Sequence, residues 1–471
     1  MSSLLGKILG RKTPATPASS RFDALSARAA SALEARDFDR AISLYEEAIA
    51  LGPGHAEAYY KYGNALRNAG RMEAAVASYS KAIEISPAYA HAYCNRGVAE
   101  QRLGQTAAAL SSYDRAIALD PRDAVAHYNR ALLMQELSRW AEARASYDRA
   151  IQLDPQFADA QYNRAVALLF QGDFANGWRA YEWRWKNAQR LCIGLERNFT
   201  QPLWLGRESI AGKRLLLYGE AGLGDTIQFC RYAKLCASLG AIVILEVAQP
   251  LQGLLQNLPG VSQLIVTGSI LPAFDYHCPL MSLPLAFGTT LDTIPSSPRY
   301  LNSDPSRVER WRKMLGVRTR PRIGLAWSGN PNNPLDARRS IPLAELAAHL
   351  APEFHYYRLQ RDVREADRDA LAAHPFLISF EDELLDFDNT AALCECMDLV
   401  ISVDTSVGHL SAALGRQTWL LLALNPDWRW LQDRTDSPWY PSARLHRQKR
   451  AGDWDNVFGR LAADLREQLR E

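Results

Sequence analysis

The first half of the chain repeats itself with a period of 34 residues. Proline, alanine and tyrosine each recur at this interval, in three separate registers. The recurring positions are Pro53, Pro87, Pro121 and Pro155, then Ala41, Ala75, Ala109 and Ala143, then Tyr45, Tyr79, Tyr113, Tyr147 and Tyr181. Small residues let paired helices approach, tyrosines fill the space between repeats, and each proline stops a helix. The first half is therefore predicted to be an α-solenoid of stacked helix pairs.

The same pattern resembles the tetratricopeptide repeat (TPR) family, whose unit is a helix–turn–helix of about 34 residues. Gly63, Gly97, Ala131 and Ala165 supply the small position of the preceding helix. Residues 1–21 are expected to form a flexible lead-in, because they include a stretch rich in Pro, Ser and Thr. The predicted solenoid spans 22–190, with repeats at 22–55, 56–89, 90–123, 124–157 and 158 to about 190. Its free concave face predicts a protein or peptide partner.

Asparagine occupies the sixth position of three consecutive repeats, as Asn95, Asn129 and Asn163. Equivalent positions of stacked helices form a line, and an amide can both donate to and accept from a peptide backbone. The arrangement resembles the asparagine ladder in the TPR superhelix of O-GlcNAc transferases, which implies peptide binding. The alternative is that these residues are ordinary solvated polar positions.

Composition excludes several classes of function. The 471 residues carry a formal net charge of +2, which gives no support for a nucleic-acid partner. No apolar run approaches the ~20 residues that span a bilayer. The seven cysteines lack a CxxC pair or zinc spacing, which favours reduced thiols in a cytoplasmic protein. The apolar residues Leu4, Leu5, Ile8 and Leu9 leave a peripheral membrane contact as a weaker alternative.

Strand-like and helical segments alternate from residue 212 onward, which predicts parallel sheets with ligands at the strands' carboxyl ends. Strands are expected at 214–219, 241–247, 263–267, 322–327, 355–360, 376–380, 398–403 and 418–424. The predicted fold class is α + α/β. The TPR solenoid is followed by a junction at 191–211 and by two Rossmann-like lobes at 212–300 and 301–471. Between Phe174 and Leu205, four tryptophans are expected to form a hydrophobic cap and domain-docking surface at the end of the solenoid: Trp178, Trp183, Trp185 and Trp204. The tryptophans of segment 425–441 are expected to pack in the interior.

A glycine-rich turn links the first strand of the second half to a helix. Its residues include Gly222, Gly224 and Asp225, and it lacks the Lys-Ser/Thr ending of a P-loop. Backbone can approach a ligand closely at such a turn. Asp225 opens the helix, where it could act in catalysis or simply cap the helix.

Two further segments suit phosphate. Asp404, Thr405, Ser406, Gly408 and His409 follow a buried strand and open a helix, where free N–H groups and hydroxyls favour an anion. The alternative is an ordinary helix cap with His409 packed on the helix. Arg338 and Arg339 end a Gly/Asn/Pro loop after another strand, and guanidinium groups match a diphosphate. A role as exposed loop arginines stays open for them.

GLGDT at 222–226 and ISVDTSVGHLSAALG at 401–415 resemble the heptosyltransferase-type family, glycosyltransferase family 9. The resemblance implies a GT-B fold and metal-independent, inverting transfer from a nucleotide-sugar, with no cofactor. It implies that Asp225 is the general base. The implied donor-binding residues are Gly222, Gly224, Arg338, Arg339, Asp404, Thr405, Ser406, Gly408 and His409.

Two functions follow as hypotheses. The first is a TPR-containing glycosyltransferase that modifies an acceptor, such as a protein, held by the solenoid. The second is a non-catalytic TPR scaffold with a degenerate transferase-like domain. Asp386 and Asp388 are interpreted as helix-start charges and not as a metal-binding pair, so no metal site is predicted.

Overall fold

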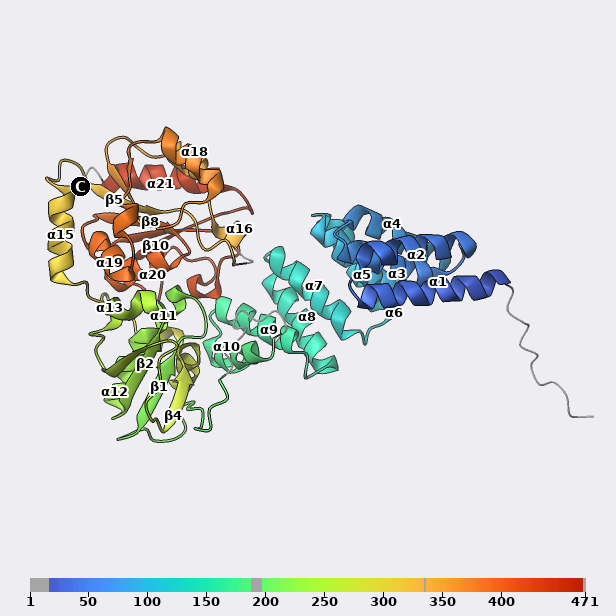
Figure 1. The fold of residues 1–471 in the computed structure, drawn as a ribbon, viewed down its shortest axis with the longest axis horizontal. Helices are drawn as coiled ribbons and strands as arrows, with labels where there is room; N and C mark the ends of the chain where they lie inside the picture. Colours follow the sequence, from blue (N-terminus) through green and yellow to red (C-terminus); the bar gives the residue numbers. More distant parts are fainter. Residues whose placement is uncertain (1–16, 188–196, 334–335, 469–471) are drawn as a thin grey trace, which may run out of the picture. The chain divides into compact units, whose positions relative to one another are not determined.

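The computed structural model describes residues 17–187, 197–333 and 336–468 (Figure 1). The chain forms two compact units, Met1–Ala160 and Gln161–Glu471. Some predictions lie outside the described residues: most of the lead-in, the Leu4, Leu5, Ile8 and Leu9 contact, Cys192, and the start of the 191–211 junction. In the described part of the chain, no helix combines the length and the apolar character needed to cross a membrane.

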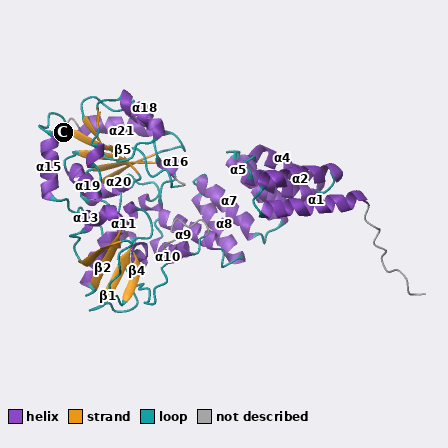
Figure 2. Ribbon diagram, in the orientation of Figure 1, coloured by secondary structure: helices purple, strands orange, loops and turns teal. Residues whose placement is uncertain are grey.

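The solenoid consists of consecutive helix pairs (Figure 2). Each repeat proline follows the end of a second helix after one intervening residue, as predicted. The helices of the first unit are α1 (Pro17–Glu34), α2 (Phe38–Leu51), α3 (Ala56–Asn68), α4 (Met72–Ile85), α5 (Ala90–Arg102), α6 (Thr106–Leu119), α7 (Ala124–Glu136) and α8 (Trp140–Leu153). The predicted lead-in was too long at its carboxyl end, because α1 already begins at Pro17. Proline suits a first helical position, where its missing N–H has no intrahelical partner.

The repeated small and tyrosine positions pack against each other inside each repeat. A Cβ on Gly63 would lie 2.6 Å from the Tyr79 ring, and one on Gly97 would lie 2.7 Å from the Tyr113 ring. Both tyrosines are fully buried, and the Tyr113 hydroxyl donates to Gln101 Oε1 at 2.8 Å. The 34-residue pattern therefore encodes both the close helix approach and the ring that fills the remaining space.

The fifth helix pair, α9 (Ala158–Phe170) and α10 (Phe174–Tyr181), falls mostly within the second unit. The predicted solenoid boundary at residue 190 therefore differs from the observed division after Ala160. The reason is the packing of α10: Trp178 Nε1 donates to the Thr289 carbonyl at 2.9 Å, and its ring meets Trp428 edge-on at 5.2 Å. Of the four tryptophans expected to form a hydrophobic cap, Trp178 and Trp204 are buried, whereas Trp183 and Trp185 are partly exposed.

The second unit contains two parallel sheets. Sheet A has the order β3-β2-β1-β4 and sheet B the order β10-β9-β8-β5-β6-β7. Sheet A is built from β1 (Arg214–Tyr218), β2 (Ile242–Val247), β3 (Val261–Val266) and β4 (Tyr276–Pro279). Sheet B is built from β5 (Arg322–Ala326), β6 (His355–Arg358), β7 (Leu377–Ile378), β8 (Leu399–Val403), β9 (Thr418–Leu422) and β10 (Ala443–Arg447). Only β4 and β10 were missed, since both are edge strands without a continuous apolar run.

Helices connect and cover the strands. They are η1 (Glu182–Trp185), α11 (Leu223–Phe229), α12 (Ala233–Ser238), α13 (Gln252–Leu255), η4 (Leu280–Ser282), α14 (Leu283–Ala286), α15 (Pro305–Leu315), α16 (Asp336–Arg339), α17 (Leu343–Ala347), α18 (Glu365–Ala373), α19 (Phe387–Glu395), α20 (Ser406–Ala413), η7 (Trp428–Trp430) and α21 (Trp454–Gln468). Helices α17 and α21 complete the apolar core of sheet B.

The strand order places a topological switch point in each sheet. In sheet B the order reverses between β5 and β8, and in sheet A it reverses between β1 and β4. Ligands of open α/β sheets bind outside the carboxyl ends of strands at such points. Helix α11 follows β1 and packs against α20, which follows β8, so the carboxyl ends of the two sheets face the same region.

Candidate functional site

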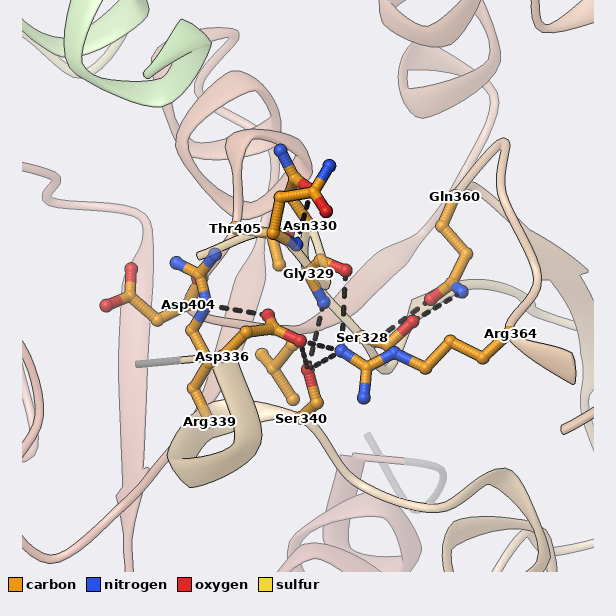
Figure 3. A network of polar contacts seen from close by, with 12 residues as sticks. Ser328, Gly329, Asn330, Asp336, Arg339, Ser340, Gln360, Arg364, Asp404 and Thr405 are labelled. Atoms are coloured by element: carbon orange, nitrogen blue, oxygen red, sulfur yellow. Dashed lines mark hydrogen bonds and ion pairs between the residues drawn. The ribbon is translucent and has the colours of Figure 1, made fainter. Parts of the chain in front are cut away.

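A polar network lies at the carboxyl end of β5 (Figure 3). Asp336 is buried and accepts hydrogen bonds from Arg339 Nε at 3.2 Å and Ser340 Oγ at 3.1 Å. Arg364, at the start of α18, also forms an ion pair with Asp336. Gly329 donates its N–H to Ser340 Oγ at 3.0 Å. One buried carboxylate therefore fixes two guanidinium groups beside the loop.

Gln360 holds the beginning of the same loop. Its Oε1 accepts the backbone N–H groups of Trp327 at 2.7 Å and Ser328 at 3.0 Å, and its Nε2 donates to Ser328 Oγ at 2.9 Å. Because the amide binds both backbone and side chain, the chain leaving β5 is fixed before it reaches the arginines (Figure 3).

Arg339 joins this network to the carboxyl end of β8. Its Nη1 donates to the backbone carbonyl of Asp404 at 2.8 Å, while its side chain remains 25% exposed. The Asp404 carboxylate itself points away from the network (Figure 3). Arg338 is exposed on α16. The structure thus brings Arg339 to the predicted site and leaves Arg338 at the surface.

Helix α20 begins at this point. Thr405 precedes it, but the Thr405 side chain does not cap the helix; its hydroxyl lies 3.1 Å from Ser402 Oγ. Ser406 is partly exposed. The alternative of an ordinary helix cap with His409 packed on the helix is therefore met in part: Thr405 occupies the N-cap position without a side-chain cap bond, and His409 is buried. N–H groups at a helix start attract anions.

His409 and Asp404 face each other in the first turn of α20, with His409 Nε2 3.7 Å from Asp404 Oδ1. Burial lowers the pKa of His409 well below its ordinary value, and neighbouring guanidinium charges lower it further, so the imidazole is neutral at neutral pH. Its Nδ1 pairs with the Tyr440 hydroxyl at 2.9 Å. Burial, with a smaller contribution from Asp427, raises the pKa of Asp404 to about 6.

The glycines of the two helices serve packing. A Cβ on Gly408 would lie 2.7 Å from Leu420 Cδ2, and one on Gly224 would lie 2.9 Å from His409 Cδ2. Protein atoms thus occupy the Cβ positions of both glycines. The expected close approach of a ligand to the backbone at these two turns stays a prediction. Gly222 starts α11 and donates its N–H to Asp225 Oδ2 at 2.7 Å.

Asp225 is engaged by two partners. Besides the Gly222 N–H, its Oδ1 forms an ion pair with Arg429 from the segment after β9. The carboxylate is 25% exposed and Arg429 is 6% exposed. The predicted cap geometry is therefore present, and an arginine that sequence reasoning missed holds the second oxygen. The Asp427-Trp-Arg429 spacing directly after a buried strand was an available signal, but only its tryptophans were considered.

The switch point of sheet A is filled by the chain itself. Arg184 from η1 is buried and donates to Glu220 Oε1 at 2.8 Å, Glu182 Oε1 at 2.5 Å and Ser282 Oγ at 2.6 Å. Glu220 and Ser282 lie just beyond β1 and β4. Burial raises the pKa of Glu220 to about 7, because its desolvation outweighs the attraction of Arg184. No sequence pattern indicated this cluster.

Two of the three predicted ladder asparagines, Asn95 and Asn129, already contact other side chains, and the third, Asn163, lies in the other compact unit. Asn95 Nδ2 donates to Tyr60 Oη at 3.0 Å and Asn64 Oδ1 at 2.9 Å, so a peptide would have to displace these bonds. Asn129 Nδ2 lies 3.5 Å from Cys94 Sγ. Asn163 lies in α9, within the second compact unit.

Metal-ligating side chains do not gather at any point of the described chain: no group of three or more His, Cys, Asp or Glu residues could hold a metal ion there. Asp386 caps α19 by accepting the Asn389 N–H at 2.8 Å, which confirms its interpretation as a helix-start charge. Trp428, Trp430, Trp439 and Tyr440 are buried, so the expected packing role of segment 425–441 is also confirmed.

Comparison with known proteins identifies the repeats. The family model described as "Tetratricopeptide repeat" matches residues 26–90, and that described as "TPR repeat" matches residues 102–138 and 136–172. Among curated proteins, Protein FlbA of Caulobacter vibrioides is 28% identical over 326 residues, which are 64% of this chain and 54% of FlbA. The chain thus spans about half the length of the curated relative it matches.

Solved structures match a third or somewhat more of this chain. A crystal structure of MamA is 24% identical and has a TM-score of 0.31, covering 33% of this chain and 91% of MamA. PilF of Pseudomonas aeruginosa is 17% identical with a TM-score of 0.35, covering 38% of this chain and 84% of PilF. The N-terminal part of the chain consists of TPR repeats, and a parallel-sheet α/β region with two sheets follows them.

Proposed function

We propose that the protein is a TPR-containing glycosyltransferase of GT-B type, with the diphosphate of a nucleotide-sugar bound at the switch point of sheet B. One observation carries the proposal. At the carboxyl ends of β5 and β8, a fixed guanidinium, the Thr405 hydroxyl and the start of α20 converge. This combination suits phosphate oxygens, and a switch point is where open α/β sheets bind ligands.

The proposed reaction uses Asp225 as general base. The acceptor hydroxyl oxygen attacks the anomeric carbon, and the bond from that carbon to the diphosphate oxygen breaks. The hydroxyl proton passes to Asp225, and the nucleoside diphosphate leaves with the bonding electrons. Arg339 and the helix start offset the charge that develops on the leaving diphosphate. Attack from the opposite face inverts the anomeric centre.

The acceptor is proposed to be a protein or peptide bound by the repeats. Support comes from the TPR array, since such repeats present a concave surface to protein partners. A second candidate function is a TPR scaffold without catalysis. The observation that favours it is the state of Asp225, whose two carboxylate oxygens already have partners.

Calorimetric titration of the full chain with UDP, ADP, GDP and their sugar conjugates tests the proposal. We expect one nucleotide series to bind with micromolar affinity and Arg339→Ala to weaken that binding at least about tenfold, as for a lost charge-assisted contact. Arg312→Ala is the control, because Arg312 is exposed on α15, the helix before the amino end of β5. Equal effects of the two substitutions, or no binding at all, would favour the scaffold.

A further inference from the structure

Arg429 is held at each end of its guanidinium group although it is almost completely buried. Its Nε donates to Gln228 Oε1 at 2.7 Å and its Nη1 donates to Asp427 Oδ1 at 2.7 Å. The third contact, from Nη2, is the ion pair with Asp225. Although burial lowers the pKa of Arg429, the Asp427 and Asp225 charges raise it above its ordinary value. The side chain is therefore a permanent, prearranged cation.

The two carboxylates differ in how they are attached. Asp427 lies two positions before Arg429 and also accepts its backbone N–H at 3.0 Å. Asp225 comes from α11, on the other sheet, 204 positions away in the chain. Both carboxylates are partly exposed, Asp225 by 25% and Asp427 by 35%, so exposure does not separate them. Asp427 is tied to both the side chain and the backbone of Arg429 within one short turn, whereas Asp225 keeps a bond to Gly222 that does not depend on Arg429. Of the two anions, Asp225 is therefore the one that can leave Arg429 without breaking the local turn.

Arg429 belongs to the surroundings of the proposed diphosphate site. Its charge contributes to the lowered pKa of His409 and acts against the raised pKa of Asp404. The next residue, Trp430, stacks on the His409 ring with centroids 5.2 Å apart. Arg339 reaches the same turn through the Asp404 carbonyl. The positive charges of Arg339 and Arg429 therefore both influence the groups at the start of α20.

A buried donor without a partner lies beside Arg429. The Gln228 side chain is fully buried, and its Nε2 finds no hydrogen-bond acceptor among the described residues, although its Oε1 accepts from Arg429. A buried N–H group without an acceptor destabilises the folded state. An anion with several oxygens that reached Arg429 would supply the missing acceptor, whereas the two oxygens of Asp225 are already bonded elsewhere.

We infer that Arg429 is a phosphate-binding residue whose ligand position is held by Asp225, and that a nucleoside diphosphate displaces this carboxylate from the guanidinium. The inference rests on the proposed function and assigns it a further donor-binding residue. The N–H groups of a guanidinium donate to phosphate oxygens in the same geometry as to carboxylate oxygens, so one anion can replace the other. The exchange frees Asp225 Oδ1 only when the donor is present, which links donor binding to the availability of the base.

Removing Asp225 tests the exchange, because it takes away the internal competitor. Binding of UDP, ADP and GDP to the full chain is measured by calorimetry at one salt concentration, for the wild type and for Asp225→Asn. We expect Asp225→Asn to bind the preferred nucleotide at least about fivefold more tightly, the lower end of usual coupling between sites. Asp436→Asn is the matched control, since it removes an exposed carboxylate from Arg434 in the same part of the chain.

Arg429→Gln and the double variant Asp225→Asn/Arg429→Gln complete a cycle. Arg429→Gln is expected to weaken binding at least about tenfold, and Asp225→Asn should give no gain in its background. Arg429→Gln alone leaves the Asp225 charge without its partner and can fold poorly for that reason. The double variant avoids this problem, because it removes both charges of the pair.

The outcomes separate the two claims. Tighter binding by Asp225→Asn, absent from Asp436→Asn, supports the inference, even if the wild type binds too weakly to measure. Nucleotide binding by the wild type with unchanged affinity in Asp225→Asn overturns the inference and leaves the proposed function standing. The absence of binding in every variant overturns both.

Discussion

The switch points of the two sheets have the same topology but different contents. In sheet A, Arg184 fills the space beyond β1 and β4, and its side chain is 3% exposed. In sheet B, Arg339 lies beyond β5 and β8 with its side chain 25% exposed. Both arginines are fixed by buried carboxylates. Arg184 is buried and fills the switch point of sheet A, whereas Arg339 at the switch point of sheet B remains partly accessible to solvent.

Topology alone therefore does not decide where a ligand binds. Strand order predicts two possible ligand sites, and whether another segment of the chain fills each of them distinguishes the two. Sheet A is covered by η1, which follows the last repeat helix, so the chain itself supplies the cation for Glu220. Sheet B has no comparable covering among the described residues at Arg339. This contrast supports the proposed ligand site at sheet B over one at sheet A.

The largest expected effect comes from removing each arginine in turn. At pH 7.5, Arg184→Ala should lower the free energy of unfolding by about 3–5 kcal/mol, because it leaves the buried Glu220 carboxylate without its cation. Arg339→Ala should cost only about 1 kcal/mol, since Arg364 still pairs with Asp336. Denaturant unfolding followed by tryptophan fluorescence reports on the second unit, because every tryptophan except Trp140 lies there. Equal losses would contradict the distinction between closed and open switch points.

The next effect is a pH dependence that belongs to sheet A. Burial raises the pKa of Glu220 from 4.5 to about 7, so the folded state keeps a proton that the unfolded chain has lost. The stability from this group is complete below pH 4.5 and is lost as the pH rises through 7, by on the order of 3 kcal/mol. Glu220→Gln should abolish this decrease.

Unfolding curves measured between pH 4.5 and 8 check this prediction. Glu309→Gln, on exposed α15, serves as the control and should leave the slope unchanged. If Glu220→Gln and the wild type show parallel pH profiles, the buried carboxyl of sheet A does not titrate as described.

Alanine substitutions at Gly408 and Gly459 test how tightly helices pack against sheet B. Gly408→Ala should destabilise by about 1–3 kcal/mol, because the added Cβ would meet Leu420 and push α20 off the sheet. Gly459→Ala, in α21, has open space around its Cβ and should stabilise by up to about 1 kcal/mol. Thermal unfolding compares the two. A harmless Gly408→Ala would mean that the glycine is there for a ligand after all.

The smallest effect concerns the ligand at sheet B. As the pH rises through about 6, Asp404 gains its charge beside the proposed diphosphate, so affinity for a nucleotide-sugar should fall by about tenfold or less. Asp427 opposes this ionisation further, while Arg339 and Arg429 favour it. Asp404→Asn should remove the dependence. The sugar conjugate is the right probe, because a terminal phosphate itself titrates near pH 6; a pH dependence retained in Asp404→Asn would contradict the assignment.

Local patterns predicted most of the fold. The 34-residue period located the helix pairs, and apolar runs located every strand except β4 and β10. Edge position alone does not explain the two misses, since the edge strands β3 and β7 were located; β4 and β10 escaped because neither carries a continuous apolar run. These results follow from interactions between residues that are close in sequence or in register.

The candidate site was predictable only in part. Arg339, Asp404, Thr405 and His409 follow strands directly, so their meeting could be foreseen from strand order. Two ion pairs could not be foreseen, because Arg429 meets Asp225 across 204 positions and Arg184 meets Glu220 across 36. Such contacts depend on the packing of whole elements. The packing roles of Gly224 and Gly408 likewise became visible only with the partner atoms in place.

Hydrogen–deuterium exchange measured by mass spectrometry, with and without saturating UDP, ADP or GDP, tests the central claim most directly. We expect slower exchange in the segments around the switch point of sheet B, which are 328–333, 404–410 and 427–430. We expect no change in the segments around the switch point of sheet A, which are 182–184, 219–221 and 280–284. Protection confined to the second set of segments, or no protection with any nucleotide, would contradict the assignment of the ligand site to sheet B.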